Sequence, residues 1–441
     1  MILSGWGRYP VLDAAVHAPR SFAELREDVR AAQSVIARGN GRAYGDSAIN
    51  TAATIKTQHL NRMLAFDPDI GQLIAEPGVL LGDIIAAFLS RGWFLAVAPG
   101  TKFVSLGGAI AADVHGKNHH KDGSFRTCVD WVDVMDAQGA VTRCSALENP
   151  VLFDHTLGGM GLTGVITRAA IRLRPVESAW MVQTTQPAAN LEAAMDLFEA
   201  NPDASYSVAW IDCLATGSTK GRSLVTLGEH ARLTDLPEDR ARAAFDVPDN
   251  RTWAVPFDAP GFALNKVTAR AFNALYYRRG SRKSGQQITN WDSFFFPLDA
   301  ILHWNRIYGR KGFAQFQCVL PLAASYAGLS ALLSAISKAE VGAFLAVLKR
   351  FGPQTSAFSF PMEGYTLALD FPVNARTLRL LSELDRITLD HGGRFYLAKD
   401  ARMSADVFAA SDKRIEAFRA ERQGNGWQNS FASAQSRRLN L

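Results

Sequence analysis

The residues from Arg38 to Asp46 form a loop whose composition suits the binding of an anion. The loop reads Arg-Gly-Asn-Gly-Arg-Ala-Tyr-Gly-Asp and follows an apolar run at Ser34–Ala37 that predicts a strand. Glycines let backbone N–H groups converge, and turns of this kind form a nest for phosphate. Arg38 and Arg42 would add positive charge. The sequence therefore predicts a phosphate-binding loop, with a surface turn as the alternative.

A second glycine-rich stretch, residues 99–120, offers a flat surface and several side chains that exchange protons. It contains Ser-Leu-Gly-Gly-Ala at 105–109 and His-Gly-Lys-Asn-His-His at 115–120. Paired glycines followed by small residues let an extended ligand lie against the backbone. His119 and His120 are adjacent, so they do not place two metal ligands on one face, and no carboxylate stands at helical spacing. No metal site is predicted.

A third stretch, residues 158–164, contains a literal GxGxxG at Gly159, Gly161 and Gly164. A dinucleotide fingerprint should follow a strand and open a helix. The residues that follow this one are β-branched and predict a strand at Val165–Leu173. Because this context is inverted, a Rossmann-type nicotinamide site is not expected.

Size and composition are those of an ordinary globular protein of two or three domains. The chain has 441 residues, 20% of them charged, and a net charge of +5. A mild basic excess suits an anionic ligand or an anionic membrane surface, and no nucleic-acid-binding motif is present. The four cysteines are far apart, which predicts reduced, buried thiols. The N-terminus lacks the pattern of a signal peptide.

The chain changes character after Arg174-Pro175, which ends a predicted strand and makes a natural boundary after the first 177 residues. The first part has short strands, glycine loops and a helix at Arg20–Gln33 with a capping box at Ser21 and Glu24. The second part predicts two strand-helix-strand units from Phe313 to Phe351 and from Tyr365 to Ala398, and an irregular segment at Glu229–Gln287. Such units predict a helix-backed, partly antiparallel sheet. The uncharged run Gly312–Ser337 is expected to be a strand and a core helix, not a membrane span.

The order of the glycine loops resembles the FAD domain of the vanillyl-alcohol-oxidase superfamily, also named for p-cresol methylhydroxylase (PCMH). In that superfamily the first loop binds the pyrophosphate, and stretches matching residues 100–117 and 158–165 enclose the rest of FAD. Many members link the flavin covalently to a histidine in the first loop, where this chain has Arg42. The resemblance implies an α+β, two-domain PCMH-type fold and non-covalent FAD. It places FAD on residues 1–177 with the return at 394–441, and the substrate on a largely antiparallel sheet domain at 178–393.

Motifs along nearly the whole chain are similar to those of the decaprenylphosphoryl-β-D-ribose 2′-oxidase family. The most specific are His-Gly-Lys-Asn-His-His at 115–120 and Ala-Lys-Asp at 398–400. The resemblance implies oxidation of the 2′-hydroxyl of a polyprenyl-phosphoryl-β-D-ribose to the 2′-keto sugar. A separate NADH-dependent reductase then completes epimerisation to the arabinose donor for cell-envelope glycans. Ala368, Thr366 and Ala43 replace a cysteine, an asparagine and a serine of mycobacterial members, so lipid length and sugar stay open. An FAD-dependent oxidase of a free alditol or sugar lactone is the alternative.

Alcohol oxidation needs a hydride acceptor, which the cofactor supplies, and a base for the hydroxyl proton. Lys399 is the first candidate, because partial desolvation beside a flavin lowers a lysine pKa; an ion pair with Asp400 is the alternative. His115 is the second candidate, with flavin binding, sugar orientation or a core role as alternatives. Tyr44 is the third.

The residues expected to contact FAD are Arg38, Gly39, Asn40, Gly41, Arg42, Ala43, Tyr44, Gly45, Pro99, Gly100, Thr101, Ser105, Gly107, Gly108, Ala111, Asp113, His115, Gly116, Asn118, Gly161, Gly164, Val165, Ile166 and Tyr396. Those expected to contact the substrate are Lys117, Trp210, Tyr308, Gln315, Gln317, Lys349, Thr366, Ala368 and Lys399.

The segment 229–287 is expected to touch a membrane, because a lipid-borne substrate keeps its tail in a bilayer. Basic residues near an anionic leaflet and inserted apolar side chains give reversible binding. This predicts a cytoplasmic protein or one peripheral at the inner membrane, with an ordinary solvated loop as the alternative. The residues involved are Phe257, Phe262, Leu264, Phe272, Leu275, Arg278, Arg279, Arg282 and Lys283.

Overall fold

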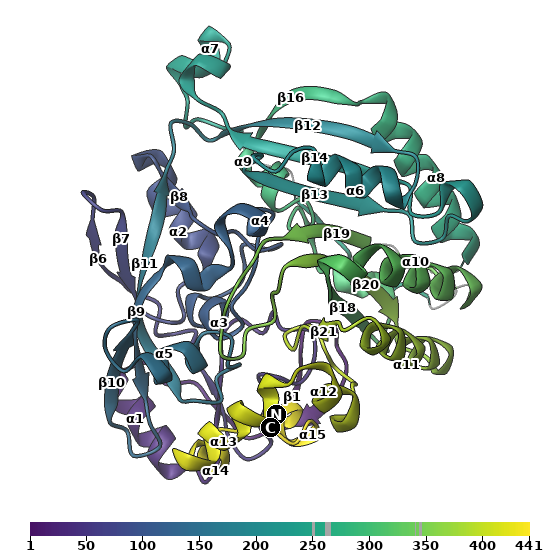
Figure 1. The fold of residues 1–441 in the computed structure, drawn as a ribbon. Coiled ribbons are helices and arrows are strands. Elements are labelled where there is room, and N and C mark those ends of the chain that lie inside the picture. Colours follow the sequence, from purple (N-terminus) through teal and green to yellow (C-terminus); the bar gives the residue numbers. More distant parts are fainter. Residues whose placement is uncertain (249–251, 261–265, 340, 344–345) are drawn as a thin grey trace.

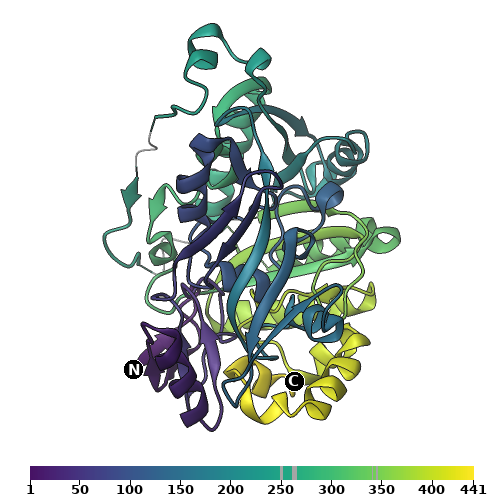
Figure 2. The same cartoon turned by 90° about the vertical axis from the view of Figure 1, so that its left-hand side faces the viewer.

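The computed structural model describes residues 1–441 apart from 249–251, 261–265, 340 and 344–345 (Figure 1). The fold is mixed α+β and is built on two large antiparallel sheets, one from each half of the chain. Both chain ends lie at the end of the molecule opposite the projecting helix α7 (Glu238–Arg242) (Figures 1 and 2). Phe262 and Leu264 of the predicted membrane segment lie outside the described residues.

The first half is built on a six-stranded sheet with the order β10-β9-β11-β7-β6, with β8 paired to β11. A small parallel sheet, β3-β5-β4, ends at the predicted phosphate loop. Helix α1 begins as predicted, because Ser21 Oγ accepts from Glu24 N at 3.2 Å and Glu24 accepts from Arg20 N at 2.8 Å. The elements are β1 (Ile2–Ser4), β2 (Val11–Asp13), β3 (Val16–His17), α1 (Phe22–Ala31), β4 (Ile36–Arg38), β5 (Thr54–Lys56), β6 (Met63–Asp67), β7 (Gln72–Ala75), α2 (Leu81–Phe88), β8 (Trp93–Leu95), α3 (Leu106–Ala111), α4 (His119–Asp122), β9 (Val129–Met135), β10 (Val141–Ser145), α5 (Pro150–Thr156) and β11 (Val165–Pro175).

The second half is built on an eight-stranded sheet with the order β16-β12-β14-β13-β19-β20-β18-β21, and every pair in it is antiparallel. Both predicted strand-helix-strand units are confirmed. Helices α6, α10 and α11 pack on one face of this sheet (Figure 1). The elements are β12 (Trp180–Ala188), α6 (Leu191–Glu199), β13 (Tyr206–Ile211), β14 (Ser223–His230), β15 (Trp253–Ala254), α8 (Lys266–Arg282), β16 (Gly285–Asn290), α9 (Trp291–Phe295), β17 (Ile301–Leu302), β18 (Phe313–Pro321), α10 (Leu322–Ala339), β19 (Ala346–Phe351), β20 (Gly364–Pro372), α11 (Ala375–Asp390) and β21 (Arg394–Phe395).

The prediction of an irregular segment at 229–287 is wrong, because α8 and β16 lie within it. Helix α8 lacks an apolar stripe: its buried positions include the small and polar residues Ala269 and Asn273, while Val267 and Leu275 are exposed. Without a stripe at helical spacing, hydrophobic periodicity gives no helix signal.

Within the described residues, α10 is the one helix long and apolar enough to cross a membrane by length and composition. Its face formed by Leu329, Leu332, Leu333 and Ile336 is fully buried in the core of the second half. The helix therefore packs as the core helix that the sequence predicts.

The C-terminal segment contacts the predicted phosphate loop, residues 38–46. It contains α12 (Ala405–Ser411), α13 (Arg414–Gly424), α14 (Trp427–Ser430) and α15 (Ala434–Arg438). Arg438 on α15 forms ion pairs at 2.8 Å with both Asp46, at the end of the predicted phosphate loop, and Asp400, next to Lys399. Both carboxylates are buried, so Arg438 joins the two segments through charges that water cannot easily screen.

We expect Arg438→Met to destabilise the protein by about 3 kcal/mol, because two buried carboxylates lose a charged partner. In thermal unfolding this corresponds to a fall in Tm on the order of 5 °C. The matched control is Arg386→Met, which removes an exposed pair with Asp390 within one helix and should cost well under 1 kcal/mol. Equal unfolding temperatures for the two variants would contradict the assignment.

Candidate functional site

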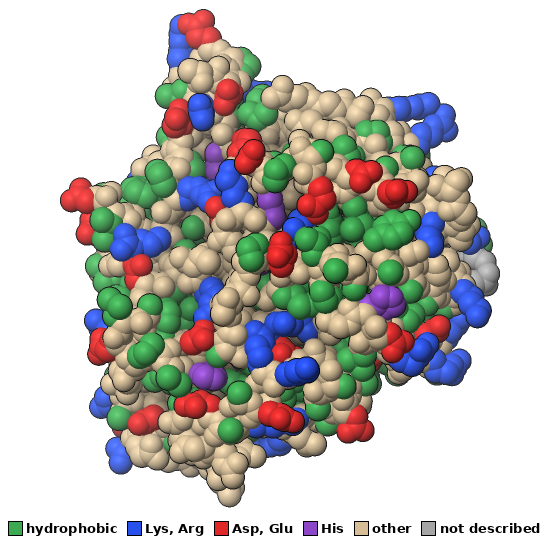
Figure 3. Space-filling view, in the orientation of Figure 1, with side chains coloured by type: hydrophobic (Ala, Val, Ile, Leu, Met, Phe, Trp, Pro, Cys, Tyr) green, Lys and Arg blue, Asp and Glu red, His purple; other side chains and the backbone are tan. Residues whose placement is uncertain are grey.

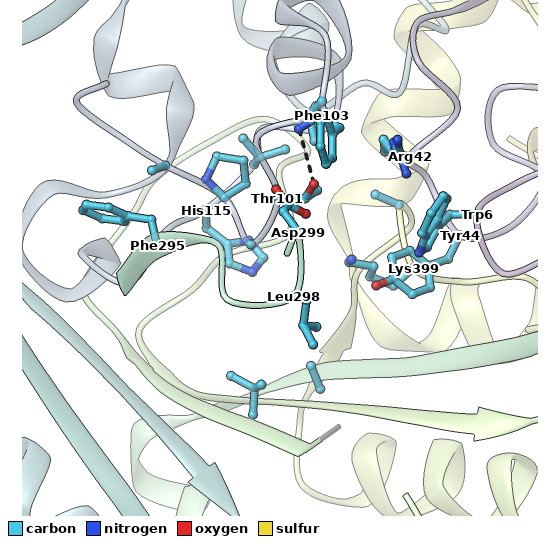
Figure 4. A pocket seen from close by; sticks show the side chains of 18 of the residues that line it. Trp6, Arg42, Tyr44, Thr101, Phe103, His115, Phe295, Leu298, Asp299 and Lys399 are labelled. Atoms are coloured by element: carbon cyan, nitrogen blue, oxygen red, sulfur yellow. Dashed lines mark hydrogen bonds between the residues drawn. The ribbon is translucent and has the colours of Figure 1, made fainter. Parts of the chain in front are cut away.

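A cavity of about 860 Å³ lies between the glycine loops of the first half and one face of the eight-stranded sheet (Figure 4). The sheet face is the one opposite α6, α10 and α11. Alternate residues of neighbouring strands reach the cavity because side chains in a strand alternate between its two faces. Gln315, Gln317, Thr366, Ala368 and Lys349 enter it in this way from β18, β20 and β19.

The predicted phosphate loop forms one wall and depends on its glycines. Gly41 has a φ of +64°, which most side chains disfavour. A Cβ on Gly39 would lie 1.9 Å from Ser105 Oγ, which caps α3. The loop thus approaches the Ser105 side chain at the start of α3 more closely than a residue with a Cβ could.

Most of the predicted site residues line this cavity. From the cofactor set these are Gly39, Asn40, Gly41, Arg42, Ala43, Tyr44, Pro99, Gly100, Thr101, Ser105, Gly107, Gly108, Ala111, His115, Gly161, Gly164, Ile166 and Tyr396. From the substrate set they are Lys117, Trp210, Gln315, Gln317, Lys349, Thr366, Ala368 and Lys399.

Seven predicted contact residues are not among those that line this cavity, and their roles stay predictions. Arg38 donates to Ser4 O at 2.7 Å, and Asp113 accepts from Ser124 Oγ at 2.8 Å. Tyr308 stacks on Phe313 behind Tyr44. Buried polar groups of this kind brace the loops because they bond to other parts of the chain. The seven are Arg38, Gly45, Asp113, Gly116, Asn118, Val165 and Tyr308.

Three buried polar atoms on the cavity wall have no hydrogen-bond partner in the described part of the chain: Arg42 Nε, Ser47 Oγ and His115 Nδ1. The Arg42 guanidinium lies over the ring of Trp6, 4.2 Å from its centroid. Figure 4 shows Arg42, Trp6, Tyr44 and Lys399 together on one side of the cavity and His115 on the other. Buried donors of this kind gain their partners from a polar ligand.

Lys399 is a buried amine that forms no ion pair among the described residues. Its Nζ lies 3.7 Å from the centroid of the Tyr44 ring. Burial, opposed by the charge of Asp370, lowers the pKa of Lys399 to about 7. The alternative of an ion pair with Asp400 is wrong, because Asp400 instead bonds Arg438 and two backbone amides.

Asp370 is a buried residue that the sequence prediction missed. Its carboxylate accepts a hydrogen bond from the Gln315 side-chain amide. Burial raises the pKa of Asp370 to about 7, while Gln315 and the charge of Lys399 oppose the rise. Asp370 stands in the register pair opposite Gln315, so only the pairing of β18 with β20 brings it here.

His115 is neutral in this site, because burial lowers its pKa well below the ordinary value and nearby lysines add to the shift. The Gln317 amide bonds its Nε2 at 3.0 Å and also bonds Thr366 Oγ1 at 3.2 Å. Since Gln317 donates to Nε2, the proton of the imidazole stands on Nδ1 as a free donor.

Two further lysines reach the cavity. Lys117 Nζ donates to Phe294 O and lies 4.3 Å from the centroid of the Phe294 ring. Lys349 has no acceptor within the described residues, and burial lowers its pKa to about 8. An unpaired lysine on a cavity wall is an anchor for a phosphate or another anion.

Comparisons with known proteins agree with this architecture. The family described as FAD binding domain matches residues 14–145. The whole chain is 36% identical to decaprenylphosphoryl-β-D-ribose oxidase of Mycolicibacterium smegmatis, and the alignment covers 97% of that protein. An uncharacterised Streptomyces coelicolor protein from the mprA 5′ region is 30% identical over 80% of this chain and 97% of its own length. L-gulonolactone oxidase of Mus musculus is 28% identical over 42% of each chain.

The fold and the cavity define an FAD-dependent oxidoreductase with a PCMH-type FAD-binding domain. The chain belongs to the family of decaprenylphosphoryl-β-D-ribose oxidase. The glycine-lined wall and the unpaired Arg42 Nε, Ser47 Oγ and His115 Nδ1 fit FAD, since its phosphates and ring system offer acceptors along an extended shape.

We expect Arg42→Met to raise the Kd for FAD by about tenfold or more, because a charge-assisted contact is lost. The unfolding temperature of the apoprotein should change little, since Arg42 Nε bonds nothing in the described protein. Fluorescence titration with FAD measures the first quantity, and Arg62→Met, at an exposed arginine that pairs with Glu76 and does not line the cavity, is the control. Unchanged FAD affinity in Arg42→Met would remove Arg42 from the cofactor site.

Proposed function

We propose that the protein oxidises the 2′-hydroxyl of a polyprenyl-phosphoryl-β-D-ribose to the 2′-keto sugar, with FAD bound non-covalently. The observation that carries the proposal is the pair of unpaired lysines, Lys399 and Lys349, in one cavity with neutral polar groups. The Lys399 amine is suited to act as the base, and the Lys349 amine is suited to bind the phosphate. The full-length similarity to a decaprenylphosphoryl-β-D-ribose oxidase supports the same substrate class.

Lys399 takes the proton of the hydroxyl. Bound FAD would supply the acceptor for the hydride of the carbinol carbon. A neutral amine is available at neutral pH because the pKa of Lys399 is lowered to about 7. The carboxylate of Asp370 then stabilises the ammonium that forms, since opposite charges in a buried site attract strongly.

His115 and Gln317 orient the sugar. The free Nδ1–H of His115 donates to a sugar oxygen or to the flavin, and the Gln317–Thr366 pair offers a second polar surface beside it. Lys349 holds the phosphate from the neighbouring strand. The ring of Tyr44 packs against the Lys399 amino group. The Tyr44 hydroxyl stays protonated, because burial raises its pKa well above 10.

The decisive experiment is anaerobic reduction of the bound flavin by a panel of polyprenyl-phosphoryl riboses, free alditols and sugar lactones. Rapid bleaching by the phosphoribosyl lipids alone supports the proposal. Bleaching by free polyols or lactones alone would establish the alternative. In the first case, the keto product needs a separate NADH-dependent reductase as the next partner to complete epimerisation.

Non-covalent FAD is expected because Arg42 stands where related proteins have a linking histidine. The purified protein should be yellow and release all its flavin into the supernatant on acid precipitation. Flavin that stays with the precipitate contradicts this expectation.

We expect Lys399→Ala to retain FAD and to slow flavin reduction by about 10²-fold or more, as for a lost base. In the unmodified protein the rate should rise with pH and level off above about pH 7, because the amine loses its proton there. Stopped-flow absorbance measures both. Lys413→Ala, at an exposed lysine, is the control, and near-normal reduction in folded, FAD-loaded Lys399→Ala would exclude Lys399 as the base.

We also propose peripheral contact with an anionic membrane through one face of α8. All four residues of the basic cluster are exposed; Arg279 and Lys283 also line the cavity, while Arg278 and Arg282 do not. Trp253, Phe257, Ile301 and Leu302 are exposed as well. The face in Figure 3 shows acidic and basic side chains interspersed, so a local site accounts for membrane contact better than a broad basic field.

Replacing Arg278 and Arg282 by Gln should weaken co-sedimentation with anionic liposomes on the order of tenfold at low salt. The control replaces Lys338 and Arg379, which are exposed on α10 and α11, and should bind as the unmodified protein does. Salt-independent binding, or none to anionic vesicles, argues against the membrane role.

A further inference from the structure

We propose that a row of apolar side chains on the cavity floor, Val347, Trp210 and Leu224, binds the first isoprene units of the lipid. The row would select substrates by the length of their isoprenoid chain. This inference rests on the proposed function and adds a binding site for the part of the substrate that does not react.

The row follows directly from the register of the sheet. Gln317 pairs with Ala368, Ala368 with Val347, Val347 with Trp210, and Trp210 with Leu224. All five side chains line the same cavity. They therefore form one straight line across β18, β20, β19, β13 and β14.

The chemistry changes along this line. Its inner end is polar, where Gln317 bonds His115 and Thr366. Lys349 lies two residues after Val347 on β19, close to the boundary between the polar and the apolar part of the row. It has no ion-pair partner among the described residues. From Ala368 outward the line is apolar, so a phosphate on Lys349 would leave an attached chain directly over Val347 and Trp210.

Helix α8 forms the wall above the outer end. The Tyr276 ring lies 4.8 Å from the Trp210 ring, centroid to centroid. A Cβ on Gly280 would lie 2.2 Å from Leu224 Cδ1, so the helix approaches the strand as closely as glycine permits. Arg279 and Lys283 stand at the mouth, where they suit an anionic surface from which a lipid would enter.

The row has a finite length. Strands are about 4.8 Å apart, so Ala368 and Leu224 are separated by roughly 14 Å. Three backbone bonds extend a chain by about 3.5 Å, so the four chain bonds of an isoprene unit extend about 4.5 Å. The row therefore holds about three units. Beside its outer end the floor turns polar at Thr226, two residues after Leu224 on β14, and at Thr185 and Gln183 on β12.

The test uses holoenzyme and phosphoribosyl lipids with one to five isoprene units, each below its aggregation concentration. Anaerobic flavin reduction gives an apparent Kd for each lipid. We expect the Kd to fall about tenfold or more per unit up to about three units, because each unit buries apolar surface. Further units should change it less than about threefold.

Trp210→Ala should flatten this dependence on chain length, and Val347→Thr should weaken it while preserving side-chain shape. Tyr326→Ala, at an exposed ring on the outer helix α10, should retain the full dependence. Equal Kd values for all chain lengths, or an unchanged dependence in Trp210→Ala, would overturn the inference and leave the proposed function standing. Failure of every phosphoribosyl lipid to reduce the flavin would overturn both.

Discussion

The ion pairs of Arg438 with Asp46 and Asp400 connect the two parts of the site that must act together. Asp46 ends the loop that forms the cofactor wall, and Asp400 adjoins Lys399. Because Arg438 and two backbone amides engage Asp400, this carboxylate does not pair with the lysine next to it. The arrangement keeps the amine at the cavity surface, where burial can lower its pKa.

The lysine is poised by opposing effects. Desolvation alone would favour the neutral amine strongly, and a close carboxylate alone would keep the ammonium. The charge of Asp370 opposes the lowering of the Lys399 pKa by burial. Burial in turn raises the pKa of Asp370 itself. The result is an amine that can gain and lose a proton near neutral pH, which a general base requires.

The eight-stranded sheet determines how the cavity changes along its length. Its strands are all antiparallel, so one face supplies a regular grid of side chains to the cavity while helices cover the other. Along the row that the register defines, polar Gln317 on β18 gives way to Ala368, Val347, Trp210 and Leu224 on the strands that follow. A substrate with a polar head and an apolar tail matches this gradient, whereas a free polyol would leave the apolar half exposed to water.

The sequence by itself determined the class of fold and most of the cavity lining. The glycine loops at 38–46, 99–120 and 158–164 are local features, because a glycine at a given turn constrains the backbone wherever the rest of the chain lies. Strand and helix periods in 313–398 are also local, and they predict both units of the large sheet.

Tertiary structure alone decided which of these residues line the cavity and which bond other parts of the chain instead. Arg38 and Arg42 look alike in sequence, yet one bonds the backbone behind the loop and the other faces the cavity. Asp370 reaches the site only through the register of β18 with β20, and Asp400 is withdrawn from Lys399 by a residue 38 positions later. Helix α8 has no stripe that sequence could reveal. Pairing, burial and charge compensation depend on residues far apart in the chain, so no local pattern encodes them.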